Sequence, residues 1–118
     1  MRSLDVAWER AKMLRNWEKW VDRILQASRE ILSSNLAGIY VFGSAVTGRL
    51  VAASDVDVLI VAENLPKSAR ARSQLKGEIL EKAGLPLVHP FEMHLADPEE
   101  AAIYFKHVER FIKVYEKR

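Results

Sequence analysis

The sequence predicts an α+β (α/β-like) fold in which a small mixed β-sheet is flanked by helices. Three observations lead to this class. Residues 4–34 carry apolar side chains at three- and four-residue spacing, which is typical of an amphipathic helix. Two short β-branched runs, 39–42 and 55–61, follow as strands. Helical and strand patterns then alternate, so we expect the order helix, strand, strand, helix, strand, helix.

The first segment is expected to form one long N-terminal helix. Its apolar stripe comprises Leu14, Trp17, Val21, Ile24, Leu25, Ile31 and Leu32, widened by Trp8, Met13 and Trp20. Asn35 and Gly38 then supply a C-terminal stop signal. The stripe is broader than one core-facing seam needs, so its tryptophans can serve either the core or a partner surface.

The two central strands differ in character. Residues 39–42 end abruptly at Gly43-Ser44, whereas residues 55–61 begin with strict alternation and become continuously apolar. The second pattern is typical of a strand that is buried on both faces at its far end. A helix is expected to begin near Pro66 and to stop at Gly84.

The last third of the chain predicts one more strand and one more helix. Prolines interrupt residues 85–90, which should be irregular or lie at a sheet edge. Residues 91–95 alternate cleanly and place Glu92 and His94 on one face. Asp97 and Pro98 fit the start of a helix. Its apolar stripe is expected to comprise Tyr104, Val108, Phe111 and Tyr115.

Length and composition favour a single cytoplasmic domain. The 118 residues suit one domain, residues 1–118, with an N-terminal helix over 1–35 and a core over 39–118. There is no cysteine, so a metal must be held by carboxylate or imidazole. The longest apolar run, 58–62, is too short to span a membrane. The net charge of +2 makes nucleic acid an unlikely partner.

One group of residues carries a chemical pattern. Gly43-Ser44 at a strand end allows a tight turn that suits a phosphate. Ten residues later, Asp55 and Asp57 project from the same sheet face, where their charges repel unless a cation lies between them. Mg²⁺ prefers such carboxylates together with substrate phosphates. Glu92 can supply a third carboxylate if its strand joins the same sheet. The alternative is that all three are solvated surface residues.

The run Phe42-Gly43-Ser44, ten residues and then Asp55-Val56-Asp57 resembles the signature of the DNA polymerase beta-like nucleotidyltransferase superfamily. The size is similar to that of its minimal nucleotidyltransferases, of archaeal and antitoxin-like type. The resemblance covers residues 39–115. At average residue usage this spacing should occur by chance in roughly one in a thousand chains of this length. The implied fold is the superfamily's palm, here preceded by the long helix.

The resemblance implies a two-metal site. Asp55, Asp57 and Glu92 would be the catalytic residues and would hold two Mg²⁺ ions, while Gly43 and Ser44 would bind the nucleotide triphosphate. Antitoxin-type members often carry a basic residue just after the Gly-Ser pair, whereas this chain has Ala45, Val46 and Thr47. Arg49 is the nearest base, and Arg72, on the following helix, is a second candidate nucleotide-binding residue. His94 is interpreted either as structural or as a contact to phosphate or to Glu92.

The expected activity is transfer of a nucleoside monophosphate, AMP from ATP, to a hydroxyl group. The chain is too small to build an acceptor pocket, so a partner protein or a dimer mate must deliver the acceptor. The resemblance implies a HEPN-type toxin as that partner and this protein as its antitoxin. Two alternatives remain. One is a non-catalytic module that neutralises its partner by contact, and the other is a small-molecule (antibiotic) adenylyltransferase.

Overall fold

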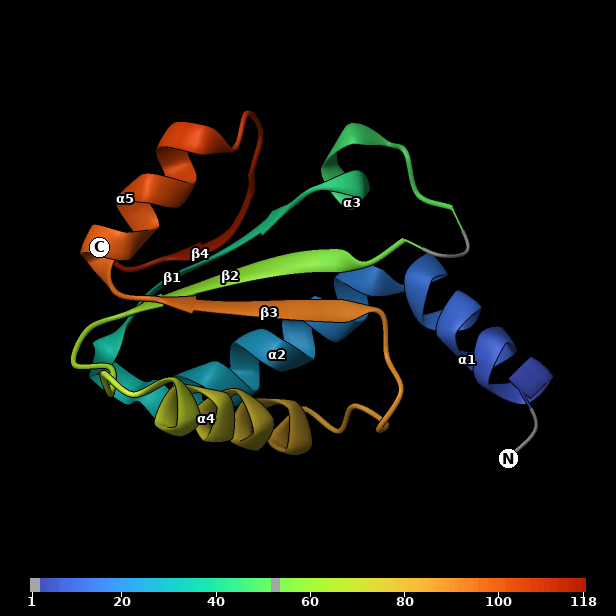
Figure 1. Ribbon diagram of the computed structural model, residues 1–118, viewed down its shortest axis with the longest axis horizontal. Coiled ribbons are helices and arrows are strands. Elements are labelled where there is room, and N and C mark those ends of the chain that lie inside the picture. Colours follow the sequence, from blue (N-terminus) through green and yellow to red (C-terminus); the bar gives the residue numbers. More distant parts are fainter. Residues whose placement is uncertain (1–2, 52–53) are drawn as a thin grey trace.

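The computed structural model describes residues 3–51 and 54–118, which form one four-stranded sheet with helices on both faces (Figure 1). The strands are β1 (Leu36–Phe42), β2 (Val56–Ala62), β3 (Phe91–Ala96) and β4 (Ile112–Glu116). The helices are α1 (Ser3–Arg15), α2 (Trp17–Leu32), α3 (Ser44–Thr47), α4 (Ala69–Lys82) and α5 (Pro98–His107), with a 3-10 turn, η1, at Ser33–Asn35. Helices α2 and α4 cover one face of the sheet and α5 covers the other.

The sheet is mixed, as predicted, with the order β3-β2-β1-β4. Strand β1 pairs antiparallel with β2 and with β4, whereas β2 pairs parallel with β3. The parallel pair is joined through α4, the kind of long crossover that parallel strands require. Because parallel strands begin at the same end of a sheet, the first residues of β2 and β3 lie side by side there.

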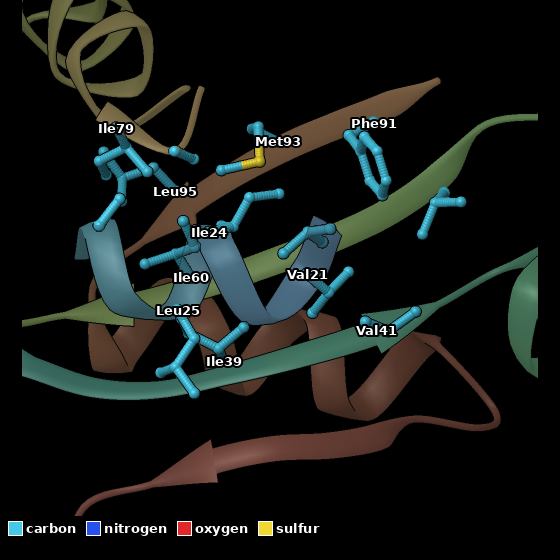
Figure 2. Close-up of a cluster of buried hydrophobic side chains, with 14 of the residues drawn as sticks. Val21, Ile24, Leu25, Ile39, Val41, Ile60, Ile79, Phe91, Met93 and Leu95 are labelled. Atoms are coloured by element: carbon cyan, nitrogen blue, oxygen red, sulfur yellow. The ribbon is translucent and has the colours of Figure 1, made fainter. Parts of the chain in front are cut away.

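The two faces of β2 are both buried, as the sequence predicts. Val56, Val58 and Ile60 face α2 and α4 and are fully buried. In Figure 2, Val21 and Ile24 of α2 point toward the face of the sheet that carries the Ile60 side chain. Leu59 and Val61 belong to the second, smaller cluster under α5. Packing on both sides fixes the register of β2 and therefore the position of Asp57 near its start.

The predicted N-terminal helix is divided in two. Asn16, with φ −114° and ψ 32°, separates α1 from α2, and its side-chain amide donates a hydrogen bond to the Lys12 carbonyl at 3.2 Å. Such local side-chain bonds compete with the helical backbone pattern, which is the physical reason for the break. Helix α2 ends at Leu32, before the predicted stop signals, and Gly38 lies inside β1. Trp8 is 55% exposed, whereas the other two tryptophans, Trp17 and Trp20, pack against the core.

The prediction for the end of the chain is wrong beyond residue 107. Helix α5 begins as expected, with a capping box in which the Asp97 carboxylate accepts from the Glu100 amide at 2.8 Å. The helix ends at His107, and Tyr115 lies in β4 instead of in a helical stripe. Strand β4 covers the edge of β1 that would otherwise carry unpaired backbone groups. This tertiary pairing outweighs the helical spacing of the aromatic residues.

Candidate active site

The Gly43 turn lies directly against the Asp57 carboxylate. Gly43 follows the last residue of β1 and has φ +81° and ψ −147°, a region that is essentially restricted to glycine. A Cβ atom at this position would lie 2.4 Å from Asp57 Oδ2. The pairing of Phe42 with Asp57 across β1 and β2 explains the approach. The turn and the carboxylate therefore form one unit, which the ten-residue spacing alone did not reveal.

Asp57 belongs to a compact cluster of three potential metal ligands. Asp57 pairs with Glu92 in the parallel register, and His94 follows Glu92 on the same face of β3. One ligand atom from each of Asp57, Glu92 and His94 lies within 4.8 Å of the others. Glu92 is exposed, while the side chains of Asp57 and His94 are 23% and 22% exposed. The two carboxylates at this separation fit a divalent cation such as Mg²⁺ or Mn²⁺, with the imidazole beside them.

Asp55 lies outside this cluster and pairs with an arginine of α1. Arg10 Nη2 donates to Asp55 Oδ1 at 2.7 Å and to the Ser54 carbonyl at 2.6 Å. The Asp55 side chain is 54% exposed. The structure thus brings Asp57 and Glu92 together and gives Asp55 a protein cation as its partner. The sequence offered no signal for Arg10, because it lies 45 residues away on a helix without a motif.

We expect Arg10→Gln to strengthen divalent-cation binding at the carboxylates. The substitution removes the guanidinium that competes with a metal for Asp55, so Mn²⁺ affinity should rise about two- to fivefold, the scale of a partly exposed ion pair. The measurement is a Mn²⁺ titration followed by electron paramagnetic resonance. Arg15→Gln, on the same helix with its guanidinium over Trp8, is the matched control. Weaker Mn²⁺ binding by the Arg10 variant would show that Arg10 does not compete with the metal.

A pocket of about 330 Å³ opens beside the Gly43 turn. It is lined by Phe42, Gly43, Thr47, Arg49, Val108, Glu109 and Arg110. Arg49, a predicted nucleotide-binding residue, therefore lies next to the turn together with Arg110, which sequence reasoning missed. Among the described residues, neither arginine forms an ion pair, although the acidic residue Glu109 also lines the pocket. With two arginines and one glutamate, the charged residues of the lining favour an anionic ligand.

Arg72 is placed away from the site. Its guanidinium donates to both carboxylate oxygens of Glu100, at 2.7 and 2.9 Å, and to the Pro66 carbonyl at 2.7 Å. These partners follow the carboxyl ends of β3 and β2, whereas Asp57 lies near the amino end of β2. The structure therefore does not bring Arg72 to the Gly43 turn or to the carboxylates. Its charge is used to tie α4 to α5, a contact between distant segments that sequence spacing does not report.

Burial lowers the pKa of His89 below its usual 6.5. Two smaller effects come from nearby charges: Asp55 raises the pKa and Arg10 lowers it. The ring also accepts a hydrogen bond at Nδ1 from the Phe91 amide at 3.1 Å, which requires that nitrogen to be unprotonated. His89 therefore holds the entry of β3, next to the carboxylates, in its neutral form.

The free energy of unfolding should fall as the pH drops below about 6.5, the unfolded-state value for histidine. A folded-state pKa that is depressed means that the unfolded chain binds the proton more tightly, so the His89 contribution is complete above that pH and is lost below it. Urea unfolding at about pH 7.5 and about pH 5.5 measures the change. His89→Gln should show a smaller pH dependence than the wild type, and an equal dependence in both proteins would contradict the assignment.

Comparison with known proteins shows the family to which the chain is similar. The model of the nucleotidyltransferase domain family matches residues 21–115. A predicted protein adenylyltransferase of Methanocaldococcus jannaschii is 38% identical over 69 residues, which is 58% of this chain and 45% of that protein. A spectinomycin 9-adenylyltransferase of Staphylococcus aureus is 43% identical over 49 residues, 41% of this chain and 19% of that enzyme. The chain thus spans less than half the length of these relatives.

A solved toxin–antitoxin structure with AMP-PNP has the same fold, with a TM-score of 0.57 at 19% identity over 82% of this chain and 73% of that one. Among the described residues, no helix is long and apolar enough to cross a membrane. The match of the family model over most of the chain confirms the resemblance inferred from the Gly-Ser and Asp-x-Asp motifs. The chain belongs to the nucleotidyltransferase domain family.

Proposed function

We propose that this protein is a metal-dependent nucleotidyltransferase that transfers AMP from ATP to a hydroxyl group on a partner protein. The observation that carries the proposal is the contact of the Gly43 turn with Asp57, beside Glu92 and His94. A turn without a side chain allows a phosphate to approach the backbone closely. The same turn touches the carboxylate that would share a cation with that phosphate. Donor phosphate and metal ligand are therefore adjacent.

Each residue has a role that follows from its position. The Ser44 hydroxyl and the backbone of the Gly43 turn would bind the triphosphate, and Arg49 would neutralise part of its charge from the neighbouring pocket. Asp57 and Glu92 would hold Mg²⁺, with Asp55 joining them once Arg10 releases it. Two Mg²⁺ ions are expected, and when bound they stabilise negative charge on the transferred and leaving phosphate groups.

The reaction is an in-line displacement at the α-phosphorus of ATP. The acceptor hydroxyl oxygen forms a new bond to that phosphorus, the α–β phosphate bond breaks, and pyrophosphate leaves. The proton of the hydroxyl needs an acceptor. Glu92 is the exposed carboxylate of the cluster and can take it, provided that one of its oxygens stays free.

A protein acceptor is the first choice for two reasons. One relative carries the name of a protein adenylyltransferase, and a toxin–antitoxin structure with AMP-PNP shares the fold. In addition, the pocket of about 400 Å³ that Glu92 lines includes neither Asp57 nor His94. We therefore expect a HEPN-type toxin to bring the hydroxyl to an open site, with this protein as its antitoxin. A homodimer is the other way to complete the site.

A second candidate is adenylylation of an antibiotic. The relative that adenylylates spectinomycin supports it, although that enzyme is about five times longer than the matched segment. A third candidate is a binding module that silences its partner by contact alone. It predicts that the carboxylates are dispensable.

Transfer of label from α-³²P-ATP separates the three. The reaction is run with Mg²⁺ and either the protein encoded by the adjacent gene or spectinomycin as acceptor. Label on the protein supports the first proposal, and label on the drug supports the second. The contact-only module predicts no label on either acceptor and equal neutralisation of the partner by wild type and Asp57→Asn.

A further inference from the structure

The Asp57 carboxylate is held from two sides. Its Oδ1 lies 3.1 Å from His94 Nε2, and its Oδ2 faces the Cα atom of Gly43, where a Cβ would approach to 2.4 Å. Neither Glu92 nor Asp55 is held in this way. Glu92 is exposed, and Asp55 is drawn toward α1 by Arg10. Asp57 is thus the one carboxylate of the three whose orientation is fixed by the sheet face itself.

The proton on His94 follows from its partners. An ionised carboxylate only accepts hydrogen bonds, so the hydrogen between Asp57 and His94 must be on Nε2. On the other side of the ring, Nδ1 lies 3.3 Å from the Tyr104 hydroxyl, which can donate to it. With the Tyr104 hydroxyl as donor, Nε2–H points to Asp57 and the lone pair of Nδ1 points to Tyr104. Both ring nitrogens are satisfied.

The ring is also fixed by packing. The His94 ring lies 5.1 Å from that of Phe42 and 5.6 Å from that of Tyr104, the latter edge-on. Phe42 comes from β1 and Tyr104 from α5, so three elements converge on one imidazole. The ring cannot turn away from Asp57 without disturbing these contacts. A side chain whose rotamer is fixed by packing and hydrogen bonds can hold a neighbouring functional group in one orientation.

We propose that His94 is a positioning residue that orients Asp57 for metal binding and does not itself ligate the metal, with Tyr104 fixing its tautomer. The proposal rests on the proposed function and deepens it. A nitrogen that carries a hydrogen has no lone pair for a metal, and Nδ1 is turned toward Tyr104. An N–H donor of this kind fixes the orientation of a ligating carboxylate, and the loss of such an outer partner typically weakens metal affinity about 10- to 100-fold.

The test is Mn²⁺ binding, measured by electron paramagnetic resonance without any transfer reaction. His94→Phe should weaken Mn²⁺ affinity about 10- to 100-fold. His94→Gln, which keeps an N–H donor, should recover most of the loss, and Tyr104→Phe should lose several-fold. Electron spin echo modulation of the wild-type complex should show no directly coordinated ¹⁴N. If the bulkier variant fails to fold, the Gln and Tyr104 variants and the ¹⁴N signal still decide the matter.

Tyr40→Phe is the matched control. The Tyr40 hydroxyl lies on the same face of the sheet but donates to Glu116 Oε2 at 2.7 Å. Burial and this carboxylate raise the pKa of Tyr40 to about 12. The control variant should bind Mn²⁺ as the wild type does. Coordinated ¹⁴N in the wild type, equal losses for the Gln and Phe variants of His94, or wild-type affinity in all His94 variants would each overturn the inference alone. A wild-type protein that binds no Mn²⁺ would overturn the proposed function as well.

Discussion

Replacing Asp57 by Asn should reduce AMP transfer by about a thousandfold or more while leaving the fold intact. Asn has the same shape but lacks the charge, so a metal bound at Asp57 and Glu92 loses its best-oriented ligand. Metal assistance contributes several kcal/mol to such reactions, and each 1.36 kcal/mol is a factor of about ten in rate. The measurement is the initial rate of label transfer from α-³²P-ATP, with circular dichroism to verify the fold.

Asp22→Asn is the control for that experiment. Asp22 is an exposed acidic residue of α2, on the face of the sheet opposite α5 and away from the cluster. Its replacement removes the same charge from the molecule and should leave the transfer rate within about twofold of the wild type, as surface changes of this kind usually do. Wild-type transfer by the Asp57 variant would show that the carboxylate cluster is not the reaction centre.

Gly43→Ala should have the second-largest effect, on both stability and activity. The added methyl group would lie 2.4 Å from Asp57 Oδ2, and the backbone conformation is one that alanine disfavours. Strain of this type costs about 1–3 kcal/mol. Because the carboxylate or the turn must move to relieve it, Mn²⁺ affinity and label transfer should fall together. Urea unfolding and the Mn²⁺ titration measure the two effects.

Gly77→Ala provides a contrast within the same chain. Gly77 lies in the interior of α4, and a Cβ there meets no other atom within 4 Å. Alanine should stabilise the helix by about 0.5–1 kcal/mol and leave Mn²⁺ binding unchanged. If the two variants bound Mn²⁺ equally well, the close approach of Gly43 to Asp57 would not matter for metal binding.

The sequence predicts those parts of the fold that local patterns determine. The continuous apolar run makes β2 a doubly buried strand, and the acidic cap starts α5 at Pro98. The parts that fail are decided by tertiary contacts or by one side chain. Asn16 breaks the first helix through its own amide, and β4 forms by pairing with the edge of β1. Neither event changes the apolar periodicity from which helices are inferred.

The candidate site divides in the same way. The alternating strands predict that Glu92 can join Asp57 if the two strands share a sheet, and the parallel register of β2 and β3 places the two residues together. The ion pair of Arg10 with Asp55 and that of Arg72 with Glu100 each join segments far apart in sequence. His94 was recognisable as a residue on the correct face, but its hydrogen bond to Asp57 requires coordinates. The sequence motif therefore could not predict these long-range polar contacts.

The most direct measurement is paramagnetic broadening of backbone amide signals by Mn²⁺ with a non-hydrolysable ATP analogue. The signals of Gly43, Ser44, Asp57 and Glu92 should disappear first, because these residues would surround the cation and the triphosphate. Signals from α2 near Asp22 should persist at the same Mn²⁺ concentration, and Asp57→Asn should restore those at the site. Broadening that begins elsewhere, or that the substitution leaves unchanged, would contradict the assignment of this turn and these carboxylates as the nucleotidyl-transfer site.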